Sequence, residues 1–222
     1  MKKLIIAIDG PAASGKSSAA KVLAKRLGYR YLDTGAMYRA LTLYVLNNHI
    51  DPNDEPMVIE ALKNCKIDVS DNYFFVNDED VTKDIRSKEV TLHVSKVCSY
   101  KGVRDYMVAQ QRELAKAGGV VLDGRDIGTV VFPHADLKFY QTASVEARAL
   151  RRYQENQAKG INMSLDEVKE DIIRRDYIDS TREHSPLRKA DDAILIDSSS
   201  SMNPENNVEV MLNYVRDLLG ED

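Results

Sequence analysis

A short run of residues near the N-terminus could bind the phosphates of a nucleotide. It fits the pattern G-x-x-x-x-G-K-[ST] without a mismatch. Glycines let the backbone wrap closely round phosphate oxygens, Lys16 can reach the β- and γ-phosphates, and the Ser17 hydroxyl can ligate Mg²⁺. The predicted loop and its first following residue comprise Gly10, Pro11, Ala12, Ala13, Ser14, Gly15, Lys16, Ser17 and Ser18.

A plainer interpretation of this run is a glycine-rich turn that only links a strand to a helix. The apolar residues 4–8 before it and the helical spacing of residues 17–27 after it favour the phosphate loop. The pattern predicts a nucleoside triphosphate site. It does not say what happens to the nucleotide, because ATPases, GTPases, kinases and sulfotransferase-like folds share such loops.

Residues that follow two further apolar segments could hold a second substrate that carries a phosphate. Thr34 lies where a helix N-cap is expected, and Arg39 follows about one helical turn later. Asp123 ends an apolar strand and Arg125 comes directly after it, so both should lie beside the phosphate loop. Guanidinium groups bind phosphate in bidentate fashion, which favours Arg39 and Arg125 as ligands of the acceptor phosphate. Asp123 would hold Mg²⁺ through a water molecule or position the acceptor.

Other interpretations stay open for the basic residues. Arg39 could lie on a solvated helix face, and Arg125, placed between Asp123 and Asp126, could form a structural ion pair. The arginine-rich segment 148–188 could be a solvated helical hairpin laced with ion pairs. We favour a lid, because a kinase needs a cover that keeps water from hydrolysing ATP. The arginines of the segment are Arg148, Arg151, Arg152, Arg174, Arg175, Arg182 and Arg188.

The elements that position these residues alternate between strands and helices, which indicates an α/β domain with a parallel sheet. Gly28 closes the first helix as a C-terminal glycine should. The expected strands are residues 4–8, 29–32, 120–122, 137–140 and 193–196, and the expected helices include 17–27, 36–48, 58–64 and 208–219.

Residues 63–93 interrupt this alternation and are predicted to be an insertion. Their alternating segments are broken by Asp71-Asn72 and Asn77-Asp78, which are hairpin signals. One long helix, about 94–117, should follow the insertion. We expect a single domain whose core is 1–62, 94–147 and 189–222, with an insertion at 63–93 and a lid at 148–188.

Composition excludes several classes of function. The chain has 222 residues and a net charge of −4, so it lacks the global basic field of a nucleic-acid binder. The only two cysteines, Cys65 and Cys98, have no metal-type spacing and are expected to be reduced, buried thiols. The apolar run at residues 4–8 is too short for a signal peptide, and no stretch is long enough to span a bilayer. We expect a cytoplasmic protein with no membrane partner.

Four motifs together resemble those of bacterial cytidylate kinases. They are the phosphate loop with Ile8-Asp9 before it, the run LDTGAMYR at 32–39, the run DGRDIGTVVFP at 123–133, and the run RDYIDSTR at 175–182. The resemblance covers nearly the whole chain. The run at 123–133 is far more specific to this family than the phosphate loop, which many families share. It implies a P-loop kinase fold: a central five-stranded parallel sheet flanked by helices, a small α+β insertion that binds the nucleoside monophosphate, and a helical arginine-rich lid.

The same resemblance implies a role for individual residues. The family binds ATP with Mg²⁺, phosphorylates CMP and dCMP, and is described as monomeric and cytoplasmic. Lys16, Asp123, Arg125 and Arg182 would act in phosphoryl transfer. Residues that match the family's acceptor site are Ser95, Arg104 and Asp126 for the cytosine, Thr34, Arg39 and Arg125 for the phosphate, Arg175 and Asp179 for the ribose, and Arg182 for a phosphate on the lid side. The chain departs mildly at Thr34, where the family often has Ser, and at Ser18, where it often has Thr.

A preference for cytosine has a physical rationale. A carboxylate such as Asp126 accepts a hydrogen bond from the exocyclic amine of cytosine and would repel the corresponding oxygen of uracil. Arg104 could donate to the ring nitrogen and carbonyl. Ser95 and Arg104 lie nine residues apart on the expected helix 94–117, so they should not share one helical stripe. Rival functions are a P-loop kinase for UMP, AMP or shikimate, and a GTP switch, although the chain has no N-K-x-D string.

Overall fold

A five-stranded parallel sheet forms the centre of the molecule, as the sequence predicts. The computed structural model describes residues 3–70, 73–200 and 203–220, and its strand order is β2-β6-β1-β7-β8. Every neighbouring pair in this sheet runs parallel. The strands are β1 (Ile5–Asp9), β2 (Arg30–Asp33), β6 (Val120–Gly124), β7 (Leu137–Thr142) and β8 (Ile194–Asp197).

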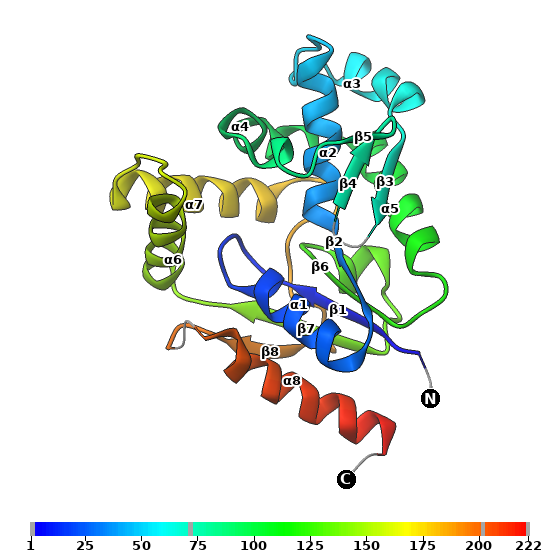
Figure 1. Ribbon diagram of the computed structural model, residues 1–222, viewed down its shortest axis with the longest axis vertical. Helices are drawn as coiled ribbons and strands as arrows, with labels where there is room; N and C mark the ends of the chain where they lie inside the picture. The colour runs from blue at the N-terminus through cyan, green and yellow to red at the C-terminus, as the bar shows by residue number, and fades with distance from the viewer. Residues whose placement is uncertain (1–2, 71–72, 201–202, 221–222) are drawn as a thin grey trace.

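Helices pack on both faces of the sheet. Successive residues of each strand point to opposite faces, so neighbouring residues contact different helices. Ile6 and Ile8 pack with apolar residues of α1 (Lys16–Leu27) and α8 (Pro204–Leu219). Ala7, between them, packs on the other face with residues of α2 (Thr34–Asn47) and α5 (Lys101–Ala115). Figure 1 shows the resulting three layers, with α8 below the sheet and α2 rising above it.

The ends of the first two helices follow their sequence signals with one correction. Gly28 adopts a left-handed conformation (φ 64°) and caps α1, as predicted. Helix α2 is capped by Asp33, whose side chain accepts from the Ala36 amide, so the prediction of Thr34 as N-cap is wrong. Asp33 fills the cap one residue earlier, which leaves the Thr34 hydroxyl free to bond elsewhere.

The insertion folds as a small antiparallel sheet among short helices. Asn77 and Asp78 both have positive φ, which matches the predicted turn between β4 and β5. The other predicted break, Asp71-Asn72, lies outside the described residues. Helix α3 (Glu55–Ala61) and the 3₁₀ turn Leu62–Asn64 lead into the insertion, whose other elements are the strands β3 (Ile67–Ser70), β4 (Tyr73–Val76) and β5 (Glu79–Asp80) and the 3₁₀ turn Asp84–Arg86. Phe74, Val76 and Ile85 share one apolar cluster with α2 and α5.

The prediction of a single helix at 94–117 is wrong, because the structure has two helices there. These are α4 (Lys88–Val97), capped by the Ser87 side chain, and α5, with residues 98–100 between them. Tyr100 takes an extended conformation and its buried hydroxyl donates to the carbonyl oxygen of Pro52 at 2.9 Å. This tertiary bond and the burial of the ring outweigh the local helical preference of the segment.

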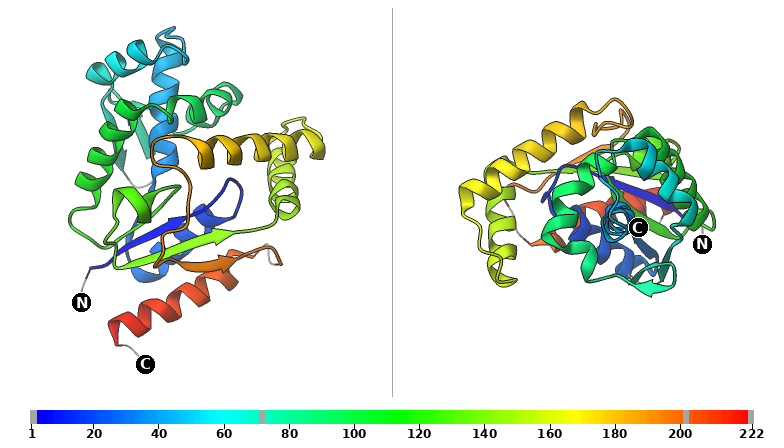
Figure 2. Two further views of the ribbon diagram at one scale, coloured as in Figure 1. Left: turned by 180° about the vertical axis from the view of Figure 1, so that it is seen from behind. Right: turned by 90° about the horizontal axis from the view of Figure 1, so that it is seen from above.

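Two further helices, α6 (Val145–Ala158) and α7 (Leu165–Thr181), form a hairpin beside the sheet (Figure 2). The hairpin has its own small apolar cluster of Ala149, Val168 and Ile172. A capping box of Ser164 and Glu167 starts α7. In the described part of the chain, no helix is long and apolar enough to cross a membrane.

Candidate active site

One cavity of about 680 Å³ opens where β1, β2 and β6 end, and it gathers residues from all the predicted site segments. In parallel α/β sheets, the carboxyl ends of the strands are where ligands bind. The lining contains these predicted site residues: Ala12, Ala13, Ser14, Gly15, Lys16, Ser17, Ser18, Thr34, Arg39, Ser95, Arg104, Asp123, Arg125, Asp126, Arg175, Asp179 and Arg182. Gly10 and Pro11, the first two residues of the loop, do not line the cavity.

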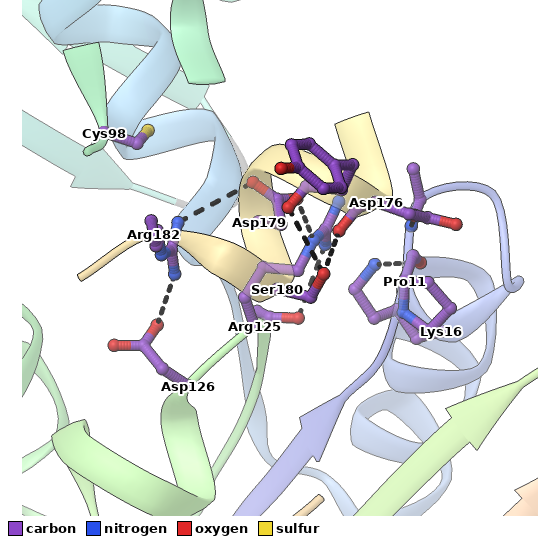
Figure 3. Close-up of polar contacts among 12 residues, drawn as sticks. Pro11, Lys16, Cys98, Arg125, Asp126, Asp176, Asp179, Ser180 and Arg182 are labelled. Atoms are coloured by element: carbon purple, nitrogen blue, oxygen red, sulfur yellow. Dashed lines mark hydrogen bonds and ion pairs between the residues drawn. The ribbon is translucent and has the colours of Figure 1, made fainter. Parts of the chain in front are cut away.

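The loop at residues 10–17 is held in a compact form around Lys16. The Lys16 ammonium donates to the carbonyl oxygen of Pro11 at 3.1 Å, as Figure 3 shows. Gly10 is required here, because a Cβ on it would lie 2.0 Å from the carbonyl oxygen of Gln141 in β7. Burial and the nearby Arg125 guanidinium lower the pKa of Lys16 to about 7. A phosphate placed beside Lys16 would raise this pKa again and favour the charged ammonium.

Side chains from outside the loop fix its backbone. The carbonyl oxygen of Ser14 accepts from Gln141 Nε2 at 2.9 Å, from Arg151 Nη1 at 3.2 Å and from Ser198 Oγ at 2.9 Å. No motif in the sequence points to Gln141 or Ser198. Only the fold brings them to the loop, because they lie 127 and 184 residues further along the chain.

The arginine-rich hairpin also contacts the loop directly. Asp176 of α7 accepts from the Ala12 amide at 3.4 Å, and Arg148 of α6 donates to the Ala12 carbonyl at 3.1 Å. Arg148 and Asp176 are themselves joined at 2.6 Å. The hairpin is therefore more than a solvated pair of helices, since one of its ion pairs holds both polar main-chain groups of Ala12.

A hydroxyl and a carboxylate lie together where the predicted loop meets β6. Ser17 Oγ donates to Asp123 Oδ2 at 2.7 Å, and the Tyr31 hydroxyl donates to the other oxygen at 2.6 Å. Burial and the charge of nearby Asp33 raise the pKa of Asp123. Tyr31 was missed by the sequence analysis, in which it was only a strand residue. Oxygen donors of this kind are those that Mg²⁺ prefers.

The residues predicted for the acceptor phosphate line the same cavity. The Thr34 hydroxyl donates to the carbonyl oxygen of Asp123 at 2.7 Å. Arg39 donates to Thr91 Oγ1 at 2.9 Å and is not on a solvated helix face. Arg125 does form an ion pair, at 2.9 Å, but its partner is Asp179 of α7 and not a neighbour in sequence (Figure 3).

More guanidinium groups face this part of the cavity than the carboxylates beside them can neutralise. Burial and the charges of Arg175, Arg152 and Arg86 lower the pKa of Arg39 to about 9. Burial and the charges of Arg125 and Arg152 likewise lower the pKa of Arg175. Among the described residues, the buried Nε of Arg175 has no hydrogen-bond partner. Such a cluster is suited to an anion with several oxygens.

The far end of the cavity is lined by a buried polar network. The Asp126 carboxylate bonds to Arg104 and lies 4.0 Å from Arg182, and the side chains of all three are at most 5 % exposed. The Arg104 guanidinium lies over the ring of Tyr38, 5.0 Å from its centroid. Tyr38 was missed, although it follows Thr34 by four residues and therefore lies on the same face of α2.

Ser95 and Arg104 line the same cavity, contrary to the expectation from a single helix. The break at residues 98–100 separates the two helices that carry them, and both side chains are buried. Both cysteine thiols are free and buried, and that of Cys98 also lines the cavity.

Comparison with known proteins gives one consistent family. The family model described as "Cytidylate kinase" matches residues 6–217. A cytidylate kinase of Geobacillus sp. (strain WCH70) is 52 % identical over 219 residues, covering 97 % of each chain. A cytidylate kinase of Fusobacterium nucleatum subsp. nucleatum is 47 % identical over 215 residues, covering 97 % of this chain and 96 % of the relative.

Solved structures resemble the chain in fold. An uncharacterized protein from Eubacterium ventriosum ATCC 27560 has a TM-score of 0.50 at 12 % identity, with 97 % of this chain and 99 % of that chain covered. A likeness at this identity concerns the arrangement of elements alone. The family match and the two relatives extend over nearly the full length of the sequence, including the loop, the insertion and the arginine-rich hairpin. The chain belongs to the cytidylate kinase family.

Proposed function

We propose that this protein transfers the γ-phosphoryl group of ATP to CMP or dCMP, giving ADP and CDP or dCDP. An oxygen of the acceptor phosphate attacks the γ-phosphorus, and the bond from that phosphorus to the oxygen bridging to the β-phosphate breaks. The observation that carries the proposal is the excess of buried guanidinium groups facing the phosphate loop across one cavity. Two phosphate-bearing ligands side by side would neutralise it.

The donor side of the reaction uses the loop and its lysine. Lys16 would move from the Pro11 carbonyl to the β- and γ-phosphates. Loop amides and the start of α1 would bind the other phosphate oxygens. Ser17 and Asp123 fit a Mg²⁺ ion, because their oxygens already lie in contact. The ion would supply neutralisation of phosphate charge.

The acceptor side uses guanidinium groups and the buried network. Arg39 and Arg125 would bind the phosphate of CMP, with Thr34 beside them, and Arg182 would neutralise charge that develops during transfer. Arg175 and Asp179 would contact the ribose. Asp126, with Ser95 and Arg104, would read the cytosine, because its carboxylate accepts from the exocyclic amine and opposes a uracil oxygen.

The larger segments have proposed roles of their own. Residues 148–188 would act as a lid that excludes water during transfer, since the α6–α7 hairpin has its own apolar cluster and touches the loop. Residues 63–93 would be the acceptor-side insertion on a core of 1–62, 94–147 and 189–222. We also propose a cytoplasmic monomer, as the family resemblance implies, and light scattering of the purified protein tests the monomer.

A coupled ADP-release assay tests the proposed function. The purified protein is given ATP with Mg²⁺ and, in turn, CMP, dCMP, UMP, AMP or shikimate. We expect CMP and dCMP to give the highest kcat/KM. Equal rates with UMP, or ADP release that does not depend on any acceptor, would contradict the proposal.

A further inference from the structure

A buried carboxylate that does not line the cavity holds the loop that carries two acceptor-site residues. Asp9 is the last residue of β1, directly before the phosphate loop, and is 4 % exposed. One of its oxygens accepts from the Ile127 amide at 2.8 Å, and the other accepts from the Gly128 amide at 2.7 Å. Carboxyl oxygens in this position need such partners, because burial removes their hydration.

The two amides belong to the first residues of a π-helical turn, Ile127–Val131. The first N–H groups of any helix lack a partner within the helix, and a side chain just before the helix usually supplies one. The side chain of Asp126, at that position, makes no such bond. Asp9 therefore caps this turn from a different strand, 118 residues away in sequence.

The turn fixes the main chain of Asp126. The carbonyl oxygen of Asp126 accepts from the Val130 amide at 2.8 Å and from the Val131 amide at 3.2 Å. Gly128 leaves little room to shift, since a Cβ there would lie 3.1 Å from the Lys138 side chain and 3.4 Å from Asp9. With its main chain held, Asp126 directs its carboxylate to Arg104, and Arg125 lies next to it.

We propose that Asp9 is a positioning residue for acceptor binding, which aims Asp126 and Arg125 by capping the turn that follows them. The proposal rests on the proposed function, because it assumes that those two residues bind CMP. Asp9 is also the residue from which the phosphate loop starts, so a single strand end sets the place of both substrates. The loop itself has independent supports in Gln141, Arg148 and Ser198, so loss of the Asp9 carboxylate should affect CMP more than ATP.

The test compares Asp9→Asn and Asp9→Ala with the full-length wild-type protein by isothermal titration with CMP and with ATP. Asn keeps one acceptor and Ala keeps none, so the Kd for CMP should rise in the order wild type, Asn, Ala. We expect about a tenfold rise for Ala, equivalent to about 1.4 kcal/mol. The Kd for ATP should change by less than about twofold, which is within the effect of an ordinary surface substitution.

A matched control removes buried atoms far from the cavity. Val215→Ala truncates a buried side chain of α8 and should lower thermal stability without changing either Kd. An equal rise in the Kd for CMP and the Kd for ATP in the Asp9 variants would overturn the proposal. So would an unchanged Kd for CMP in both Asp9 variants. If Asp9→Ala does not fold, Asp9→Asn carries the test alone. A wild-type protein that binds no CMP would contradict the proposed function instead.

Discussion

At the scale of single residues, the site depends on ionisable groups that are buried before any substrate arrives. Lys16 is 5 % exposed, and its neighbours include Arg125 as well as the carboxylates Asp123, Asp33 and Asp179. Burial dominates, so its pKa in the free protein lies near 7 and not near 10.5. Burial therefore disfavours the charged form of this lysine in the free protein, although phosphate binding needs that form.

Binding of ATP at pH 8 should be accompanied by a net uptake of protons. Phosphate oxygens beside Lys16 favour the charged form and raise its pKa back above the solution pH. Titration calorimetry in two buffers of different ionisation enthalpy measures this uptake. Lys16→Met should bind ATP weakly and take up no proton, whereas Lys25→Met, which changes an exposed lysine of the same helix, should behave like the wild type. Absence of uptake in the wild-type protein would contradict the assignment.

The sequence predicts residues well where one contiguous motif carries the chemistry. The loop, its strand and its helix are adjacent in the chain, so pattern and context agree. Tyr31, Gln141 and Asp9 are different, because their contacts join segments that are far apart in sequence. A buried hydrogen bond of this kind leaves no periodic signal.

At the scale of elements, helix α7 contacts both the cavity and the phosphate loop. It carries Arg175 and Asp179, which line the cavity and are proposed to contact the acceptor, and Asp176, which contacts the loop. With Arg148 of α6, Asp176 binds the amide and the carbonyl of Ala12. A change in the conformation of the loop should therefore alter the contacts of helix α7.

Asp176→Asn should weaken ATP binding about 3–10-fold, because the neutral side chain loses its charge-assisted bond to Arg148, worth roughly 1 kcal/mol or more when partly buried. CMP binding in the absence of ATP should change less. Equilibrium titration with a non-hydrolysable ATP analogue measures the first quantity. Asp171→Asn is the matched control, since it breaks an exposed ion pair with Arg174 on the same helix. Equal effects of the two substitutions would show that the contact with the loop does not matter.

Which elements exist is predicted better than where they begin and end. Helix α2 is capped by Asp33, and the helix expected at 58–64 is α3, at Glu55–Ala61, followed by a 3₁₀ turn. The five strands and most helices follow from apolar periodicity and caps. The break between α4 and α5 does not, because the bond from Tyr100 to Pro52 determines it. The break matters for the site, because one continuous helix would have kept Ser95 and Arg104 on different faces.

At the scale of the whole molecule, an acidic chain surrounds a cationic cavity. The net charge is −4, yet Arg39, Arg125, Arg152 and Arg175 repel one another at the centre. Folding the free protein must work against that repulsion and against the desolvation of each group. Some stability is therefore given up so that phosphate can be bound.

The repulsion among these arginines predicts that removing one of them can stabilise the free protein while it weakens the binding of phosphate ligands. Arg175→Met should raise the melting temperature of the ligand-free protein by several degrees. An apolar side chain of similar volume removes the desolvation cost of the guanidinium and its repulsion by Arg125 and Arg152, and each kcal/mol gained shifts Tm by about 2–4 °C in a chain of this size. CMP and inorganic phosphate should both stabilise the wild type, and both should stabilise the variant less.

Scanning calorimetry with and without ligand separates these two effects. Arg174→Met, at the next position of the same helix, changes an exposed arginine and should alter neither the melting temperature nor the response to CMP. A ligand-free Arg175→Met protein that melts below the wild type would mean that the attraction of Arg175 to Asp179 and Asp171 outweighs its desolvation and the repulsion among the guanidinium groups. In that case the arginine cluster would be a structural element of the fold, and its use in holding two phosphates would need another explanation.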